Sequence, residues 1–513
     1  MSDRRFGYGR KFGTSTKFGA TTTNSFCAWI VEVDWDGDGV FDGSTESRFM
    51  TGISISRGRK RQVDSTGAGF EQQSVGKASI ELSNIDGRYN GWNTASVLYP
   101  NVTYGRDVRI KIRDLVAGTV EPVFYGVISD IQPSGYGSDA KVTITVDDGW
   151  NFLRNYTARV AVQLGVAPHT AIGAILDYVR WPTRWGRSLE TSSDVIPYWW
   201  TSGNKTAASE IQDVAYSFIG NFFIDASGQA VYQNRSTVSD LAVEFLQEYM
   251  LKDIGNPQPW VNSRNVIRIK THPRALSGTE TLYQLTGVQP SILAGESYSI
   301  FGSYTYNNQT VPAYSIVTPV ASTDYVMNTA ADGSGTDKTA DCTVTATNLG
   351  DTVKLLITNN SLVTVYITTL QVRGVAVYEV SASDVFYPTD PDTVEQPREF
   401  ILDQLWLQDV NVALDSINIL GEYFSTLKPM PIIQIENRFS YQFGLELFDS
   451  VTANIGYLGI SGESYKIGGI EHKSYGENCQ RVVTTFYLEP YPFSGEYWAW
   501  DTRSVFGTDI FGA

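Results

Sequence analysis

Four aspartates and a glycine follow the alternating apolar segment 30–33 at a spacing that could hold a metal ion. Short carboxylate side chains at alternate positions bring oxygens around a hard cation such as Ca²⁺, and glycine permits the sharp turn between them. The residues match positions one, three, five, six and nine of a calcium loop, and they are Asp34, Asp36, Asp38, Gly39 and Asp42.

The end of the calcium pattern is missing from this segment. The twelfth position, which normally supplies a bidentate carboxylate, is Thr45, and Glu46 comes one residue late. No helical pattern flanks the segment. Asp and Gly also build turns between strands without any metal. Two interpretations therefore stay open: a bound calcium ion as the one cofactor, and an Asx/Gly hairpin with no cofactor.

Residues for other chemistry occur without the spacing that catalysis needs. His169, His272 and His472 are the only histidines and lie far apart in the sequence. The sequence has no HExxH motif, no histidine pair at metal-ligand spacing and no GxSxG nucleophile motif. Acidic pairs such as Asp147-Asp148 are expected by chance in an acidic chain, and glycosidases need two carboxylates at a set separation. We therefore expect that the chain is not an enzyme.

The segments around the aspartates have the pattern of short antiparallel strands. Residues 78, 80 and 82 are Ala, Ile and Leu, and residues 108, 110 and 112 are Val, Ile and Ile, each set at period two. The first of these strands stops at the turn signal 84–87, where Gly87 can adopt a positive φ at little energetic cost. We expect a compact antiparallel β-domain of the split-barrel type over residues 28–155.

A basic arm, residues 1–27, precedes this domain and has a Phe-Gly pair every six residues. A segment of this composition cannot build a core alone. One interpretation is docking, in which each Phe fills a pocket on a partner and the cations pair with an acidic neighbour. The other is a terminus that is basic by chance. The residues that we assign to assembly are Phe6, Phe12, Phe18, Arg4, Arg5 and Arg10.

The rest of the chain divides by its periodicity. Residues 156–271 are mixed α/β, with helical stripes at 168–179 and 206–219. Residues 272–390 are rich in Thr, Ser, Tyr and Val and predict an inserted β-sandwich. Residues 391–495 predict a long helix over 399–427 and then a β-domain that completes the mixed domain begun at 156–271, and 496–513 form a C-terminal extension. The predicted fold class is mainly β with some α, in several domains.

The bulk composition limits the function further. The net charge of −16 argues against a nucleic-acid-binding surface, because neutralising phosphates requires clustered Lys and Arg. Three scattered cysteines are too few for a disulfide framework. No secretory signal and no apolar run of membrane-spanning length occur in the sequence. We therefore expect a protein made in a cytoplasm, without a membrane span and without sequence-specific nucleic-acid binding.

The order of motifs between residues 29 and 155 resembles the minor tail proteins of long-tailed bacteriophages (siphoviruses), the tail-tip or baseplate hub family. The motifs are Asp-Trp-Asp-x-Asp-Gly at 34–39, Leu-Ser-Asn-x-Asp-Gly-Arg-Tyr at 82–89, Leu-Tyr-Pro-Asn-Val followed by Gly-Arg-Asp-Val-Arg-Ile within 98–110, and Phe-Tyr-Gly-Val-Ile-Ser-Asp-Ile at 124–131. The resemblance is weaker at 221–232 and 465–490. It does not extend to 272–390.

This resemblance implies a structural virion protein of the phage tail tip, assembled in the bacterial host cytoplasm. As a hub it would form a homotrimer that closes the tail tube, contact the distal tail protein, the tape measure and other tail-tip proteins, and open for DNA ejection. The alternative is a carbohydrate-binding adhesion protein for host attachment, in which the 272–390 sandwich contacts a host cell-surface glycan. Its candidate aromatic residues are Tyr298, Tyr304, Tyr306 and Tyr314.

Overall fold

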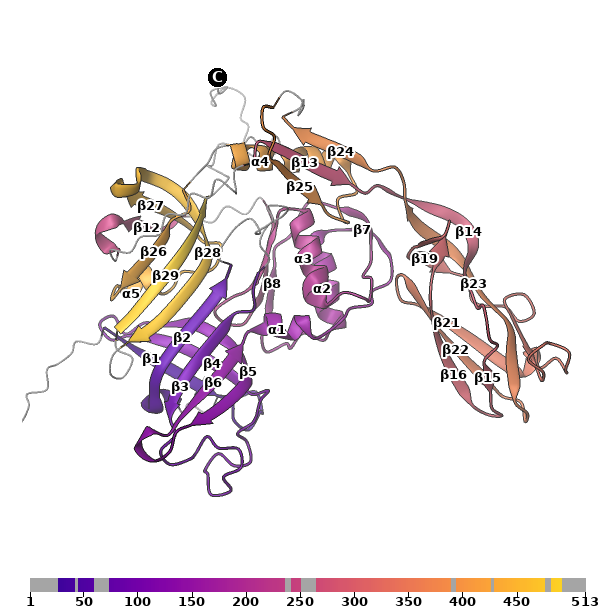
Figure 1. Ribbon diagram of the computed structural model, residues 1–513, viewed down its shortest axis with the longest axis horizontal. Coiled ribbons are helices and arrows are strands. Elements are labelled where there is room, and N and C mark those ends of the chain that lie inside the picture. Colours follow the sequence, from indigo (N-terminus) through magenta and orange to yellow (C-terminus); the bar gives the residue numbers. More distant parts are fainter. Residues whose placement is uncertain are drawn as a thin grey trace, which may run out of the picture.

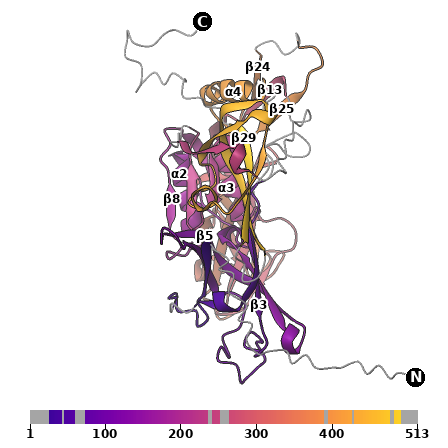
Figure 2. The same ribbon diagram turned by 90° about the vertical axis from the view of Figure 1, so that its left-hand side faces the viewer.

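The chain folds mainly into β-strands, arranged as a flat arch (Figure 1). The structure, a computed structural model, describes residues 26–41, 45–59, 73–235, 241–250, 264–388, 394–425, 429–475 and 481–490. Strand accounts for 47% and helix for 15%, which confirms the prediction of a mainly β chain with some α. Figure 2, turned by 90°, shows that the arch is thin in the third dimension.

The first six strands form one curled antiparallel sheet in the order β1-β4-β5-β6-β3-β2. Trp29, Ile55, Ile80, Ile110 and Ile144 come from different strands and are all buried in one core, so the sheet wraps around its own apolar face. β1 and β2 are not paired with each other in the part of the chain that the structure describes, so the curl is open between them. The strands are β1 (Cys27–Val33), β2 (Met50–Gly58), β3 (Lys77–Ser83), β4 (Asp107–Asp114), β5 (Val120–Ser134) and β6 (Lys141–Asp147).

Strand β2 continues this sheet into strands from the other end of the chain. It pairs antiparallel with β28, from Ser54 opposite Lys473 to Gly58 opposite Gly469, and the result is one 11-stranded sheet. Gly58 has a φ of +81°, and a Cβ there would overlap the Gly468 carbonyl. The additional strands are β12 (Leu241–Leu246), β26 (Ile432–Glu436), β27 (Ser450–Ile455), β28 (Ile460–Tyr475) and β29 (Arg481–Pro490), with α5 (Phe439–Gln442) beside β26.

A helical part lies in the middle of the arch, where it packs three helices around one apolar core (Figure 1). α2 (Pro168–Tyr178) and α3 (Ala207–Ser217) confirm the two helices expected from the stripes. Thr206 caps α3 by accepting the Ser209 N–H at 3.2 Å. The remaining elements are α1 (Gly149–Arg154), β7 (Gln163–Val166), β8 (Arg187–Leu189), β9 (Ile196–Trp199), β10 (Asn221–Ile224) and β11 (Ala230–Gln233).

The predicted helix over 399–427 is wrong in its first third. Residues 399–403 form β25 (Glu399–Asp403), which pairs parallel with β13 (Val266–Thr271), and the helix α4 begins later (Val410–Ser425). Phe400 and Leu402 are buried at period two in β25, which is the pattern of a strand and not of a helix turn. β24 (Ser383–Tyr387) completes this small sheet, and α4 packs on it. No described helix is long and apolar enough to cross a membrane.

Residues 274–379, which we call the insertion, form a body of two larger sheets and one two-stranded ribbon at the right of Figure 1. The insertion contacts the helical part, since Val377 belongs to that core and Arg274 lies over the Trp200 ring. Its core lies between the sheets and includes Leu282, Val353, Leu355, Ile357 and Ile367. The strands are β14 (Arg274–Gln284), β15 (Ser291–Ile292), β16 (Ser297–Ser303), β17 (Thr305–Tyr306), β18 (Gln309–Thr310), β19 (Ala313–Ile316), β20 (Tyr325–Asn328), β21 (Cys342–Asn348), β22 (Thr352–Asn359) and β23 (Val365–Glu379).

Candidate functional site

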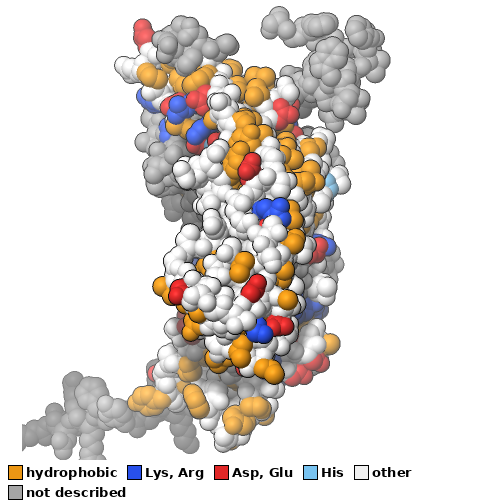
Figure 3. Space-filling view, turned by 90° about the vertical axis from the view of Figure 1, so that its right-hand side faces the viewer, with side chains coloured by type: hydrophobic (Ala, Val, Ile, Leu, Met, Phe, Trp, Pro, Cys, Tyr) orange, Lys and Arg blue, Asp and Glu red, His pale blue; other side chains and the backbone are white. Residues whose placement is uncertain are grey.

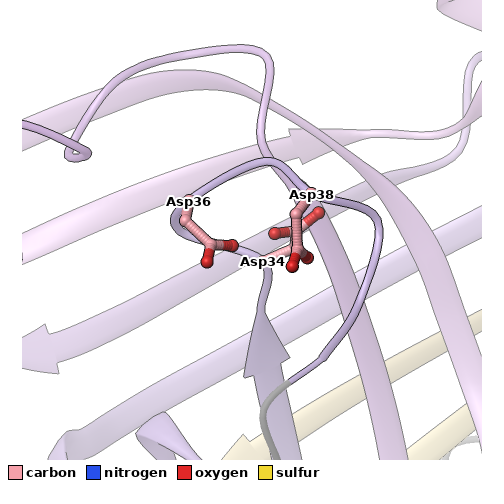
Figure 4. Close-up of side chains that lie close together, drawn as sticks. All are labelled: Asp34, Asp36 and Asp38. Atoms are coloured by element: carbon pink, nitrogen blue, oxygen red, sulfur yellow. The ribbon is translucent and has the colours of Figure 1, made fainter.

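The three described aspartates of the acidic turn lie directly after β1 and face one another (Figure 4). One carboxylate oxygen from each of Asp34, Asp36 and Asp38 lies within 4.8 Å of the others. Asp42, the fourth predicted ligand, lies outside the described residues. Asp34 is buried, whereas Asp36 and Asp38 are exposed. The turn therefore gathers three carboxylates, as the sequence predicts.

Backbone donors already occupy the buried carboxylate. Asp34 Oδ1 accepts the Gly37 N–H at 2.8 Å, and its Oδ2 accepts the Gly39 N–H at 2.9 Å. Asp38 Oδ1 accepts the Val40 N–H at 2.7 Å. These bonds stabilise a turn without any cation, as in an Asx/Gly hairpin. Each carboxylate oxygen has a second lone pair, so the donor set is also chemically suited to Ca²⁺.

The turn is anchored to the neighbouring strand and to the helical part. The Asp34 N–H donates to the Asp107 carbonyl at 3.0 Å, where β1 meets the start of β4. The Asp107 side chain, which is 3% exposed, accepts hydrogen bonds from Arg184 Nε to Oδ2 and from Nη2 to Oδ1, the latter at 3.1 Å. Asp107 therefore connects the first sheet to the loop after α2.

The predicted assembly residues cannot be placed. Phe6, Phe12, Phe18, Arg4, Arg5 and Arg10 all lie outside the described residues. The predicted role of the arm stays a prediction.

Sequence reasoning missed a buried ion pair at the junction of β2 and β28. Arg59 donates from Nε and Nη2 to the two oxygens of Glu489 at 2.9 and 2.8 Å, and both side chains are 7% exposed. Burial alone would lower the pKa of Arg59, but the Glu489 carboxylate raises it above its ordinary value. The partners are 430 residues apart, so no local motif could reveal the pair.

Two buried titratable groups lie near the same junction. Asp148 caps α1, with Oδ1 accepting the Trp150 N–H at 3.0 Å and Oδ2 accepting the Gly76 N–H at 2.9 Å. Desolvation raises the pKa of Asp148 to about 7. His472 stacks on Phe443 and hydrogen-bonds Thr484 Oγ1 at 2.9 Å, and desolvation lowers the pKa of its imidazole to about 3. His472 is thus a neutral packing residue.

A cluster of charged groups surrounds His272, where the chain enters and leaves the insertion. His272 Nδ1 lies 3.0 Å from Glu379 Oε1, and Nε2 lies 2.6 Å from Asp403 Oδ1. Lys270 is 3.5 Å from Asp403 and Arg274 is 3.7 Å from Glu379. His272 thus connects the two ends of the insertion, near residues 272 and 379, to Asp403 in β25, and we interpret the role of this cluster, which we call the clamp around His272, as structural.

The tyrosines expected to form a glycan-binding surface do not share one environment. Tyr304 is fully buried and belongs to the core of the insertion, which removes it from that role. Tyr298 and Tyr314 are 48% and 40% exposed, and Tyr306 packs partly buried against Tyr378. The exposed Phe301, on β16, was not expected from the sequence.

The fold is similar to solved structures of tail proteins. The 43 kDa tail protein of prophage MuSo2 from Shewanella oneidensis is 10% identical over 91% of this chain and 98% of that chain, with a TM-score of 0.49. The tail protein from Neisseria meningitidis MC58 is 8% identical over 90% and 96%, with a TM-score of 0.47. Prophage tail protein gp18 from Listeria monocytogenes EGD-e is 8% identical over 90% and 94%, with a TM-score of 0.41.

No family model matches the sequence, and no curated protein matches it. At these identities and TM-scores, no residue role passes from the solved proteins to this chain.

Proposed function

We propose that the chain is a structural component of a long-tailed phage tail tip, a baseplate hub or minor tail protein that forms a ring around the path of the DNA. The proposal starts from the motif order at 29–155, which resembles that family. The single structural observation that supports it most is the pairing of β2 with β28, which sets the two β-regions side by side in one sheet.

The ends of this sheet supply a reason for assembly. Among the described strands, β1 pairs only with β4, β12 only with β27, and β26 only with β29. Two of these edges are partly covered, because Val31 of β1 bonds Ser47 and Thr45, and Ile435 of β26 bridges Met250. An exposed strand edge presents unpaired N–H and C=O groups, and closure into a ring is one way to cover such edges. Copies placed side by side would bring these edges together, and a homotrimer is the ring that the family resemblance implies.

The charge of the chain suits a channel for DNA. With a net charge of −16, an acidic inner wall would repel the phosphate backbone, so DNA could pass without releasing counterions and binding tightly. In this proposal the ring closes the tail tube, contacts the distal tail protein and the tape measure, and opens for ejection. Its role is structural and requires no catalytic residue.

An epitope-labelling experiment tests the location. A tag inserted after Gly333, in an exposed turn of the insertion, is detected with gold-conjugated antibody on intact tail particles. We expect one cluster of label at the tail end distal to the capsid. Label along the tail shaft or on the capsid would contradict the proposal.

A second candidate function is attachment to a cell-surface glycan through the insertion. The observation that favours it is the position of the insertion at one end of the arch (Figure 1), with Phe301 exposed on β16 at 57%. Aromatic rings bind the apolar faces of sugars while their rims stay hydrated. Binding of the full chain to host cell-wall polysaccharide, lost in Phe301→Ala and kept in Leu362→Ala, would support it; equal binding by all three proteins would refute it.

A further inference from the structure

Residues 84–106, between β3 and β4, form a loop without helix or strand that is nevertheless fixed by a regular series of turns. We call this segment the tip loop. Five successive backbone N–H groups each donate to the carbonyl three residues earlier, at 2.9 to 3.2 Å. The donor and acceptor pairs are Gly87 to Asn84, Asn90 to Gly87, Asn93 to Asn90, Ser96 to Asn93 and Tyr99 to Ser96.

Side-chain hydrogen bonds within the tip loop further stabilise these turns. Asn84 donates to Asn90 Oδ1 at 3.0 Å and accepts the Tyr89 N–H at 3.1 Å. Asn93 donates to the Gly87 carbonyl at 3.0 Å, and Ser96 donates to the Arg88 carbonyl at 2.6 Å. Ordering a backbone costs about 1–2 kcal/mol per residue, so the fold holds this long loop in one shape at a considerable entropic cost.

The tip loop presents large apolar side chains to solvent. Trp92 is 97% exposed and Tyr104 is 77% exposed, and both line an open pocket of about 710 Å³ whose other side includes Ile131 and Pro133. Three more residues of the loop and one of the adjoining β5–β6 hairpin are exposed, namely Ile85, Val97, Tyr99 and Tyr136. Figure 3 shows hydrophobic side chains gathered at this lower end of the molecule.

A rigid loop with exposed aromatic anchors is typical of a protein-docking surface. Pre-ordering removes much of the entropy that a flexible loop would lose on binding. Exposed apolar groups in such number mark interaction sites on soluble proteins. The polar side chains of the pocket are already committed: Asn93 binds within the loop, and Asp130 accepts from Ile131 N–H and Gln132 Nε2 at 2.8 and 2.5 Å. This favours an apolar occupant over a saccharide.

The acidic side chains near the pocket favour an apolar occupant that also carries positive charge. Asp130 lines the pocket, and Asp139 is exposed in the hairpin beside it. Residues 1–25 have the complementary composition, with five Lys or Arg, one Asp and the three Phe-Gly pairs at six-residue spacing. Aromatic anchors with flanking cations are the usual hot-spot residues of an interface.

We infer that the tip loop of one copy binds the Phe- and Arg-rich arm, residues 1–25, of a neighbouring copy. The arm joins β1 at Cys27, which pairs with Asp114 at the end of β4 remote from the tip loop. The seven residues of β1 separate those two ends by about 23 Å at the usual rise per residue. Since an extended arm of this length reaches about 80 Å, this separation allows it to reach the tip loop of either copy. The choice of a neighbouring copy as the partner depends on the proposed ring, whereas the contact between arm and tip loop does not.

Photo-cross-linking in the full chain tests this contact. The photo-reactive residue p-benzoylphenylalanine is placed at position 12 instead of Phe12, and that protein is mixed with ¹⁵N-labelled unsubstituted chain before irradiation. We expect cross-linked peptides that join position 12 of the unlabelled chain to residues 84–106 or 133–139 of the labelled chain. Cross-links within one chain, cross-links to other surfaces, or no cross-link would overturn the inference.

Surface variants show whether the aromatic side chains carry the contact. Trp92→Ala with Tyr104→Ala should reduce the cross-link yield about tenfold, the effect of losing roughly 1.4 kcal/mol of binding energy at a hot spot. Tyr457→Ala, which removes an 81% exposed tyrosine from the turn between β27 and β28, should leave the yield unchanged. Equal loss in both variants, or no loss in the double variant, would contradict the assignment. A chain absent from tail tips that still forms the cross-link would refute the proposed function alone.

Discussion

Asp34 stabilises the acidic turn more than either of its neighbours because it is the buried carboxylate and accepts two backbone N–H groups. We predict that Asp34→Ala lowers the stability of the first sheet by about 1–3 kcal/mol, since two buried donors lose their acceptor. Asp38→Ala, at an exposed position with one such bond, should cost less than half as much. The midpoints of urea unfolding, followed by Trp fluorescence, measure both; equal effects would contradict this assignment.

Calcium binding by the acidic turn needs an experiment of its own, distinct from the stability measurements on Asp34 and Asp38. Since backbone donors already satisfy Asp34, we predict that a chelator leaves the thermal unfolding midpoint of the wild-type chain unchanged. Added Ca²⁺ should likewise produce no saturable heat in calorimetry. A midpoint that falls with chelator and recovers with Ca²⁺, but not with Mg²⁺, would show instead that the three carboxylates bind the ion.

Asp148 gives the chain a predictable pH dependence. Its pKa is about 7 in the folded protein against 3.8 as the ordinary value, because it is desolvated. Between these values the folded state holds a proton that the unfolded state has lost, so the stability that Asp148 contributes falls as the pH rises. Asp148→Ser keeps an N-cap that does not titrate.

The comparison of wild type with Asp148→Ser isolates that contribution. We predict that the unfolding free energy of the wild type declines, relative to the variant, as the pH is raised from 3.8 to about 7, and that the difference is constant above this window. Denaturant unfolding at a series of pH values measures it. A difference that grows with rising pH has the opposite sign and would show that the carboxylate is stabilised in its charged form.

At the scale of elements, the junction of β2 and β28 depends on the buried Arg59–Glu489 pair. Removing one partner of such a pair leaves an uncompensated buried charge, at a cost of about 3–5 kcal/mol. We predict that Arg59→Met is destabilising by this amount and that Glu489→Leu added to it recovers most of the loss. Chemical denaturation of four proteins, namely the wild type, Arg59→Met, Glu489→Leu and the double variant, measures the coupling. A double variant as unstable as the sum of the single variants would contradict it.

Local patterns predicted elements well wherever one face of an element is buried. Apolar stripes predicted the helices α2, through Ile172 and Ile175, and α3, through Ile211 and Val214. The backbone hydrogen bonds of a helix are local, so its apolar stripe can be recognised without knowing a distant partner segment. The same pattern failed at 399–403, where the partner strand β13 is more than a hundred residues earlier. Tertiary pairing there overrides the local helical period.

The residues of the candidate site also fall into those that the sequence could predict and those that it could not. The convergence of Asp34, Asp36 and Asp38 could be predicted because the three residues lie within one turn. The Arg59–Glu489 pair and the clamp around His272 could not, since their partners come from segments separated by 430 residues and by 107 and 131 residues. The exposed aromatic residues of the tip loop were also missed, because composition alone does not separate an exposed Trp from a buried one.

At the scale of the whole molecule, we propose that several copies place their joined sheets side by side around the DNA path. Among the described strands, β1, β12 and β26 each have one strand partner in this sheet, and the tip loop presents exposed aromatic side chains. Both features favour the association of copies, because pairing strand edges and burying apolar surface lower the free energy of the assembly.

Cryo-electron microscopy of intact tails, at a resolution that separates strands, tests this claim most directly. We predict an annulus at the tail tip in which each copy contributes β1–β6 and β26–β29 to the wall, with the insertion outside it. A single copy placed off the tail axis, or tails whose tips lack the chain, would contradict the account.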